Sequence, residues 1–184
     1  MATATPLPSE VWAVFCGSID QAAVQRIFQA FGTAMTATVK NIHLLFQSTG
    51  GVVGDGVCLY NYFRCLTIDL TLYNVGSVQS IAVVAYLGAK KRKTSARATF
   101  MIHRTTYVPQ PADAYRLKIA THLVTTDDQR TESILRDHIH LSDGDWSDLN
   151  NHEFTFSGEE AVKIGMADEI GEFSPPSGSM IYNI

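Results

Sequence analysis

The sequence predicts an α/β fold in which a mainly parallel sheet is built from strand–helix–strand units. Short apolar runs alternate with helix-like segments along the chain, and most of the runs end at a glycine or a polar residue. The chain has 184 residues, of which 46% are hydrophobic, so it can form one domain with a sizeable core. We therefore expect a single domain that spans residues 1–184.

The alternation is clearest in the first hundred residues. Strands are expected over residues 11–16, 42–46, 67–73 and 99–102, where β-branched and aromatic residues are frequent. Helices are expected between them: one that begins after Ser18 or Asp20 and ends at Gly32, and two over residues 57–65 and 78–89. Because parallel strands need such crossovers, the pattern indicates βαβ units.

The second half of the chain is more polar. Two helices are expected, over residues 112–124 and 127–139, because Thr126, Asp127 and Asp128 form a good N-cap between them. The remaining elements are expected to be short: a strand at 154–156, a helix at 159–164 and a last strand at 167–173. The two ends, residues 1–10 and 174–184, are expected to be loose.

Composition and charge exclude several classes of function. The net charge of −4 gives no electrostatic basis for binding nucleic acid or an anionic membrane, and the basic run at residues 90–93 is expected to be a solvated turn. No targeting segment is visible and no apolar stretch is long enough to span a membrane, so a cytoplasmic protein is expected. His138 and His140 lack a nearby cysteine or carboxylate cluster, so neither a metal site nor another cofactor is expected.

Unusual residues follow three of the predicted strands. Gly50 and Gly51 follow the strand at 42–46, Ser80 follows the strand at 67–73, and His103 ends the strand at 99–102. The carboxyl ends of parallel strands meet at one edge of a sheet, where a serine and a histidine could act as nucleophile and base. Each feature also has a structural explanation, since Ser80 could cap a helix, the glycines could end a strand and His103 could be structural.

Five segments together resemble the proteolytic subunits of Clp protease. Residues 48–52 resemble that family's Ser-Pro-Gly-Gly segment, and residues 76–82 resemble its Gly-Gln-Ala-Ala-Ser-Met-Gly nucleophile segment. Residues 88–92 are similar to its Gly-Ala-Lys-Gly-Lys-Arg turn, and residues 101–103 match its Met-Ile-His segment. Residues 157–168 are similar to its Ser-Ala-Glu-Glu-Ala-x-x-Tyr-Gly-Leu-x-Asp segment. The order and approximate spacing of these segments match over most of the chain.

The resemblance implies a crotonase-like fold with a helical handle at residues 112–140, and the activity of a serine endopeptidase. Ser80 would be the nucleophile and His103 the general base, while the backbone N–H groups of Gly51 and Ile81 would form the oxyanion hole. The family carries an aspartate where this chain has Glu153, which would orient His103. Asn151 and Asp148 are alternatives for that role.

The resemblance also implies partners. The substrate would be a peptide or an unfolded protein, the chain would form a homo-oligomeric ring, and an ATP-driven AAA+ unfoldase would feed it. Residues 104–109 depart from the family's glycine-rich strand, Thr49 replaces a proline and Ala82 a glycine, which argues against the usual unfoldase and ring stacking. Two alternatives stay open: a non-catalytic subunit that assembles with an active partner, and a crotonase-fold acyl-CoA enzyme.

Overall fold

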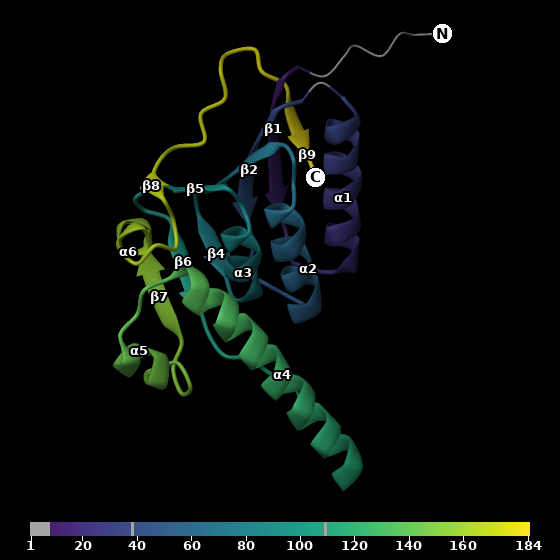
Figure 1. Ribbon diagram of the computed structural model, residues 1–184, viewed down its shortest axis with the longest axis vertical. Helices are drawn as coiled ribbons and strands as arrows, with labels where there is room; N and C mark the ends of the chain where they lie inside the picture. Colours follow the sequence, from purple (N-terminus) through teal and green to yellow (C-terminus); the bar gives the residue numbers. More distant parts are fainter. Residues whose placement is uncertain (1–7, 38, 109) are drawn as a thin grey trace.

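The computed structural model describes residues 8–37, 39–108 and 110–184, and it contains two sheets (Figure 1). All neighbouring strands of the larger sheet pair in parallel, in the order β8-β5-β3-β2-β1-β9. Its strands are β1 (Glu10–Cys16), β2 (Asn41–Gln47), β3 (Asp69–Asn74), β5 (Lys91–Thr94), β8 (Glu169–Ile170) and β9 (Ile181–Asn183). The predicted α/β fold with a mainly parallel sheet is confirmed.

The smaller sheet joins its strands in the order β4-β6-β7, with β4 and β6 parallel and β6 and β7 antiparallel. Its strands are β4 (Ser77–Gln79), β6 (Thr99–Ile102) and β7 (Phe154–Ser157). The helices are α1 (Gln21–Thr36), α2 (Val53–Arg64), α3 (Ile81–Leu87), α4 (Ala114–His138), α5 (Asp143–Asp148) and α6 (Gly158–Lys163).

The core lies between the larger sheet and helices α1, α2 and α3. Burial alternates along β1 and β2, and one face of these strands presents the fully buried Phe15, Leu44 and Phe46. Every residue of α3 is buried, which explains why its sequence is apolar all round. This packing fixes the start of α3, the position where Ser80 lies.

Some boundaries in the first half differ from the prediction, most clearly the end of α1 and the start of α3. Helix α1 begins after Asp20, whose carboxylate accepts the N–H of Ala23 at 2.8 Å, and it continues through Gly32 to Thr36. The helix predicted over 78–89 begins only at Ile81, because residues 77–79 form β4 instead. A tertiary pairing of β4 with β6 outweighs the apolar helical pattern there.

The basic run predicted to be a solvated turn is largely strand β5. Two of its charges have partners: Lys93 pairs with Glu169 at 2.9 Å, and Arg92 contacts Asp168. Backbone pairing with β3 and β8 places these cations beside carboxylates of the neighbouring strand. The prediction of a turn was therefore wrong. Strands are recognised in a sequence by alternating apolar and polar residues, and a strand of charged residues that form ion pairs lacks this alternation.

The two helices predicted over 112–124 and 127–139 are one continuous helix, α4, which extends away from the two sheets (Figure 1). The expected N-cap does not form, because the carboxylate of Asp128 accepts the N–H of Thr105 at 2.7 Å. Threonine hydroxyls along the helix donate back to its own carbonyl groups, as Thr125 and Thr126 do. The segment contains no glycine or proline that would end the helix.

The C-terminal segment is not loose, contrary to expectation. Strand β9 pairs with the edge strand β1, and the N–H of Ile184 donates to the carbonyl of Val14 at 3.0 Å. Phe173 packs edge-on against Trp12 and Tyr73. The unpaired backbone groups of β1 explain why this polar segment becomes ordered.

Two further expectations concern the ends of the fold. The last strand, predicted over 167–173, is reduced to β8. Of the expected loose N-terminus, residues 1–7 lie outside the described residues, while Glu10 already belongs to β1. Within the described ranges, no helix combines the length and apolar character needed to cross a membrane.

Candidate active site

Ser80 lies at the junction of β4 and α3 in an unusual backbone conformation. Its φ of 55° makes it the non-glycine residue with a positive φ among those described. A residue held in this way stores about 1–3 kcal/mol of strain, which the surrounding structure must offset. The N–H of Ser80 donates to the carbonyl of Met101 at 2.7 Å and anchors it. Its hydroxyl makes no helix-capping hydrogen bond, so the interpretation of Ser80 as a helix cap does not account for this side chain.

The paired glycines make room for this serine. A Cβ on Gly50 would lie 2.6 Å from the Cβ of Ser80, and a Cβ on Gly51 would lie 2.1 Å from the carbonyl oxygen of Ile19. Both glycines also have positive φ angles, 96° and 152°. Larger residues would clash at both positions, so the glycines allow the loop to pass directly beside Ser80.

The histidine predicted as base lies beside the predicted nucleophile. The Nε2 of His103 is 2.8 Å from the Oγ of Ser80, within hydrogen-bonding distance. Parallel pairing of β4 with β6 places Gln79 opposite Met101, so the residues that follow each strand converge on one point. Together they border a small cavity of about 70 Å³.

The two predicted oxyanion-hole residues border the same cavity. Gly51 and Ile81 both line it. The residues on either side of Gly51 hold this loop. The carbonyl of Gly50 accepts the N–H of Ile19, and the N–H of Val52 donates to the carbonyl of Ile19. Neither of these two hydrogen bonds uses the N–H of Gly51. Ile81 is the first residue of α3, where backbone N–H groups have no acceptor within a helix. Both residues therefore lie at the cavity beside Ser80, and the oxyanion hole formed by their backbone N–H groups stays a prediction.

Glu153 directly precedes β7 and forms no hydrogen bond with His103 among the described residues. The last residue pair of the β6–β7 ladder is Ile102 with Phe154, so Glu153 is one step beyond it, across from His103. Glu153 is exposed, and among the described residues His103 forms no hydrogen bond with it, with Asp148 or with Asn151. The role of Glu153 stays a prediction, which the strand register supports.

Two of the other histidines have structural partners. His43 stacks on Trp12 and lies within hydrogen-bonding distance of Tyr73 and Glu10. The Nε2 of His138 is 3.0 Å from the hydroxyl of Tyr60, and burial, together with the charges of nearby arginines, lowers the pKa of His138. These contacts explain both residues as parts of the fold.

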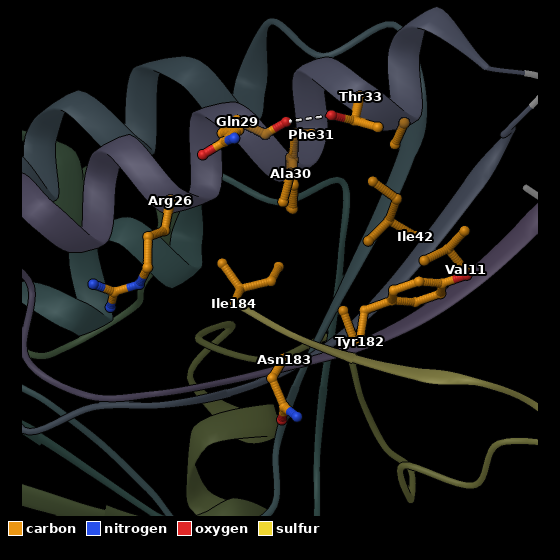
Figure 2. A pocket seen from close by; sticks show the side chains of 12 residues that line it. Val11, Arg26, Gln29, Ala30, Phe31, Thr33, Ile42, Tyr182, Asn183 and Ile184 are labelled. Carbon is orange, nitrogen blue, oxygen red and sulfur yellow. Dashed lines mark hydrogen bonds between the residues drawn. The ribbon is translucent and has the colours of Figure 1, made fainter. Parts of the chain in front are cut away.

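The described part of the chain also has two larger grooves. One of about 430 Å³ lies between α1 and β9, lined by apolar residues such as Phe31 and Tyr182 with Arg26 at its margin (Figure 2). The other, of about 480 Å³, shares Gly51 and Thr105 with the cavity at Ser80 and extends along α4. The second groove therefore continues the candidate site and offers room for an extended ligand.

Sequence reasoning missed a group of residues beside His103. Arg104, Thr105 and Asp128 connect the end of β6 to α4, and Arg104 also contacts Glu132. These pairs are separated by more than twenty positions in the chain, and no local pattern marks them. Only the three-dimensional contact reveals them.

The fold and the site define an α/β protein in which a serine and a histidine lie within hydrogen-bonding distance of each other, an arrangement suited to acyl transfer. A family model for Clp protease matches residues 5–174, so the chain belongs to the Clp protease family. This confirms the resemblance seen in the sequence.

Individual relatives agree with this assignment. The chain is 26% identical over 134 residues to the ATP-dependent Clp protease proteolytic subunit of Bacteroides thetaiotaomicron, covering 71% of this chain and 60% of that protein. The corresponding subunit of Bacteroides fragilis is 27% identical over 134 residues, with 71% and 64% covered. The chain thus spans less than two thirds of the length of these curated relatives. The fold is similar to that of a point mutant of ClpP1 from Listeria monocytogenes, with a TM-score of 0.74, 21% identity, and 89% and 91% of the two chains covered.

Proposed function

We propose that this protein is a serine endopeptidase that hydrolyses peptide bonds through an acyl-enzyme on Ser80. The observation that carries the proposal is the 2.8 Å distance between Ser80 Oγ and His103 Nε2. A serine hydroxyl is a weak nucleophile until a base takes its proton, and a neutral imidazole at this distance is suited to that task.

The proposed reaction uses this pair in two roles, as nucleophile and as base. Ser80 Oγ attacks the peptide carbonyl while His103 Nε2 takes its proton, and the developing oxyanion receives hydrogen bonds from the N–H groups of Gly51 and Ile81. His103 then gives the proton to the leaving amine. Water attacks the ester in the reverse sense and releases the acid. Glu153 would orient the imidazole and stabilise its protonated form.

The assembly proposed from the family is a homo-oligomeric ring. Helix α4 projects from the two sheets and exposes apolar side chains that a neighbouring subunit could cover (Figure 1). They are Tyr115, Leu117, Ile119 and Leu123. Peptides or unfolded segments would be the substrates, and an AAA+ unfoldase would be the partner that delivers them.

A second candidate is a non-catalytic subunit that assembles with an active partner. The observation in its favour is the absence, among the described residues, of a carboxylate hydrogen-bonded to His103. The acyl-CoA alternative is less consistent with a serine–histidine pair at 2.8 Å, because that chemistry usually employs carboxylates at these positions.

Hydrolysis of a fluorogenic peptide separates the two candidates. The purified chain should cleave the peptide, and Ser80→Ala and His103→Ala should each abolish cleavage, by about a thousandfold or more. Ser177→Ala, at an exposed position far along the chain, is the matched control and should leave the rate unchanged. Equal rates in Ser80→Ala and the unsubstituted chain would refute the peptidase.

A further inference from the structure

The side chain of Arg104 connects the segment after His103 to other parts of the fold. The guanidinium of Arg104 donates to Glu132 Oε2 at 2.6 Å through Nη1. Its Nε and Nη2 both donate to Asn150 Oδ1, at 3.0 and 2.6 Å. One side chain thus connects three elements: the end of β6, the helix α4 and the turn between α5 and β7.

The next residue reinforces the same connection. The backbone N–H of Thr105 donates to Asp128 Oδ1 at 2.7 Å, one helical turn before Glu132 on α4. Glu132 also accepts a hydrogen bond from Arg136 at 2.7 Å, and the guanidinium of Arg136 lies 4.3 Å from the ring centre of Trp146 on α5. The contacts therefore form a continuous network beside the catalytic cavity, which Arg104 itself lines.

This network joins the segment after His103 to the turn that precedes Glu153. Asn150 lies three residues before Glu153, on the turn that leads into β7, and His103 directly precedes Arg104. We propose that Arg104 is a positioning residue, which holds the turn carrying Glu153 and the helix α4 in place so that His103 stays aligned with Ser80.

The burial of the network supports this role. The side chains of Arg104 and Glu132 are 22% and 24% exposed, so their ion pair is shielded more than a surface pair. Burial raises the pKa of the Glu132 carboxyl, but the hydrogen bonds and charges of Arg136 and Arg104 outweigh it and hold that pKa below its ordinary value. The planar guanidinium serves Glu132 and Asn150 at once, which a lysine ammonium cannot do in the same geometry.

The experiment rests on the proposed function, and it measures peptide hydrolysis by the full chain. Arg104→Gln should lower kcat by about 10- to 100-fold, because a small misplacement of a catalytic group is costly, while KM changes by less than about twofold. Arg104→Lys keeps the positive charge but loses the planar guanidinium with its several donors, so its kcat should also be lowered. Arg97→Gln, at an exposed arginine, is the control and should match the unsubstituted chain.

The same variants have a readout that needs no catalysis. Amide hydrogen exchange of residues 102–106 and 149–154 should be faster in Arg104→Gln than in Arg97→Gln. Full activity and unchanged exchange in Arg104→Gln would overturn the inference, and so would full rescue by lysine, since charge alone would then suffice. If the unsubstituted chain itself fails to cleave peptides, the proposed function falls, and the positioning role falls with it.

Discussion

A methyl group on Gly50 would lie 2.6 Å from the Cβ of Ser80, closer than real Cβ atoms approach one another. Gly50 also has a φ of 96°, a conformation that a non-glycine residue adopts at a cost of about 1–3 kcal/mol. Gly50→Ala should therefore displace Ser80 and lower kcat/KM by about 100-fold. Steady-state kinetics with a fluorogenic peptide would measure it.

Gly32→Ala is the matched control for that substitution. Gly32 lies within α1, and a Cβ there would meet nothing within 4 Å. The alanine should stabilise the protein by about 1 kcal/mol, through helix propensity, and leave the activity unchanged. Near-normal activity of Gly50→Ala would show that the loop does not constrain the serine.

The strand register makes a prediction for the third triad member. Because Glu153 lies across from His103, Glu153→Gln should lower kcat by about 100-fold or more if the carboxylate orients the imidazole. Asp148→Asn removes the alternative carboxylate and should change kcat by less than about threefold. The opposite ranking of the two variants would move the role from Glu153 to Asp148.

The lowered pKa of His138 should make the free energy of unfolding depend on pH. Burial, followed by the charges of Arg92 and Arg64, lowers its pKa from the ordinary value of 6.5 in the folded chain. Below that ordinary value the unfolded chain binds a proton that the folded chain resists, so the free energy of unfolding falls as the pH falls. His138→Gln should flatten this dependence, measured by urea unfolding between about pH 7 and 5. Parallel curves for the two proteins would exclude His138 as the cause.

The packing of Phe173 should contribute to the free energy of unfolding. Its ring packs edge-on against Trp12 and Tyr73, with centroid distances of 5.2 and 5.5 Å. Phe173→Ala should lower the free energy of unfolding by about 1–3 kcal/mol, whereas Met180→Ala, at a position 68% exposed, should change it by less than about 0.5 kcal/mol. Equal effects of the two substitutions in denaturant unfolding would show that the ring contributes no specific packing.

The fold class and several candidate site residues could be predicted from the sequence because the patterns that indicate them are local. Ser80, His103 and Gly51 follow strands whose apolar runs are easy to recognise, and parallel strands bring their carboxyl ends together. The α/β class follows from the same alternation. The order and spacing of the family segments then favoured the prediction that Ser80 is a nucleophile over the prediction that it caps a helix.

Long-range contacts explain what could not be predicted. Strands β4, β5 and β9 are formed by pairing with distant strands, and their own sequences are too short or too polar to mark them. The break expected within α4 fails because Asp128 bonds to Thr105 rather than to its own helix. The link from Arg104 to Asn150, over 46 positions, is likewise invisible in the chain order.

If His103 activates Ser80 as a nucleophile, Ser80 should react with a serine-directed reagent. A fluorophosphonate probe followed by peptide mass spectrometry tests it most directly, because the probe forms a stable ester only with an activated serine. One modified residue is expected, Ser80, with labelling lost in Ser80→Ala and strongly slowed in His103→Ala. Folded protein that remains unlabelled, or that is labelled equally in His103→Ala, would contradict it.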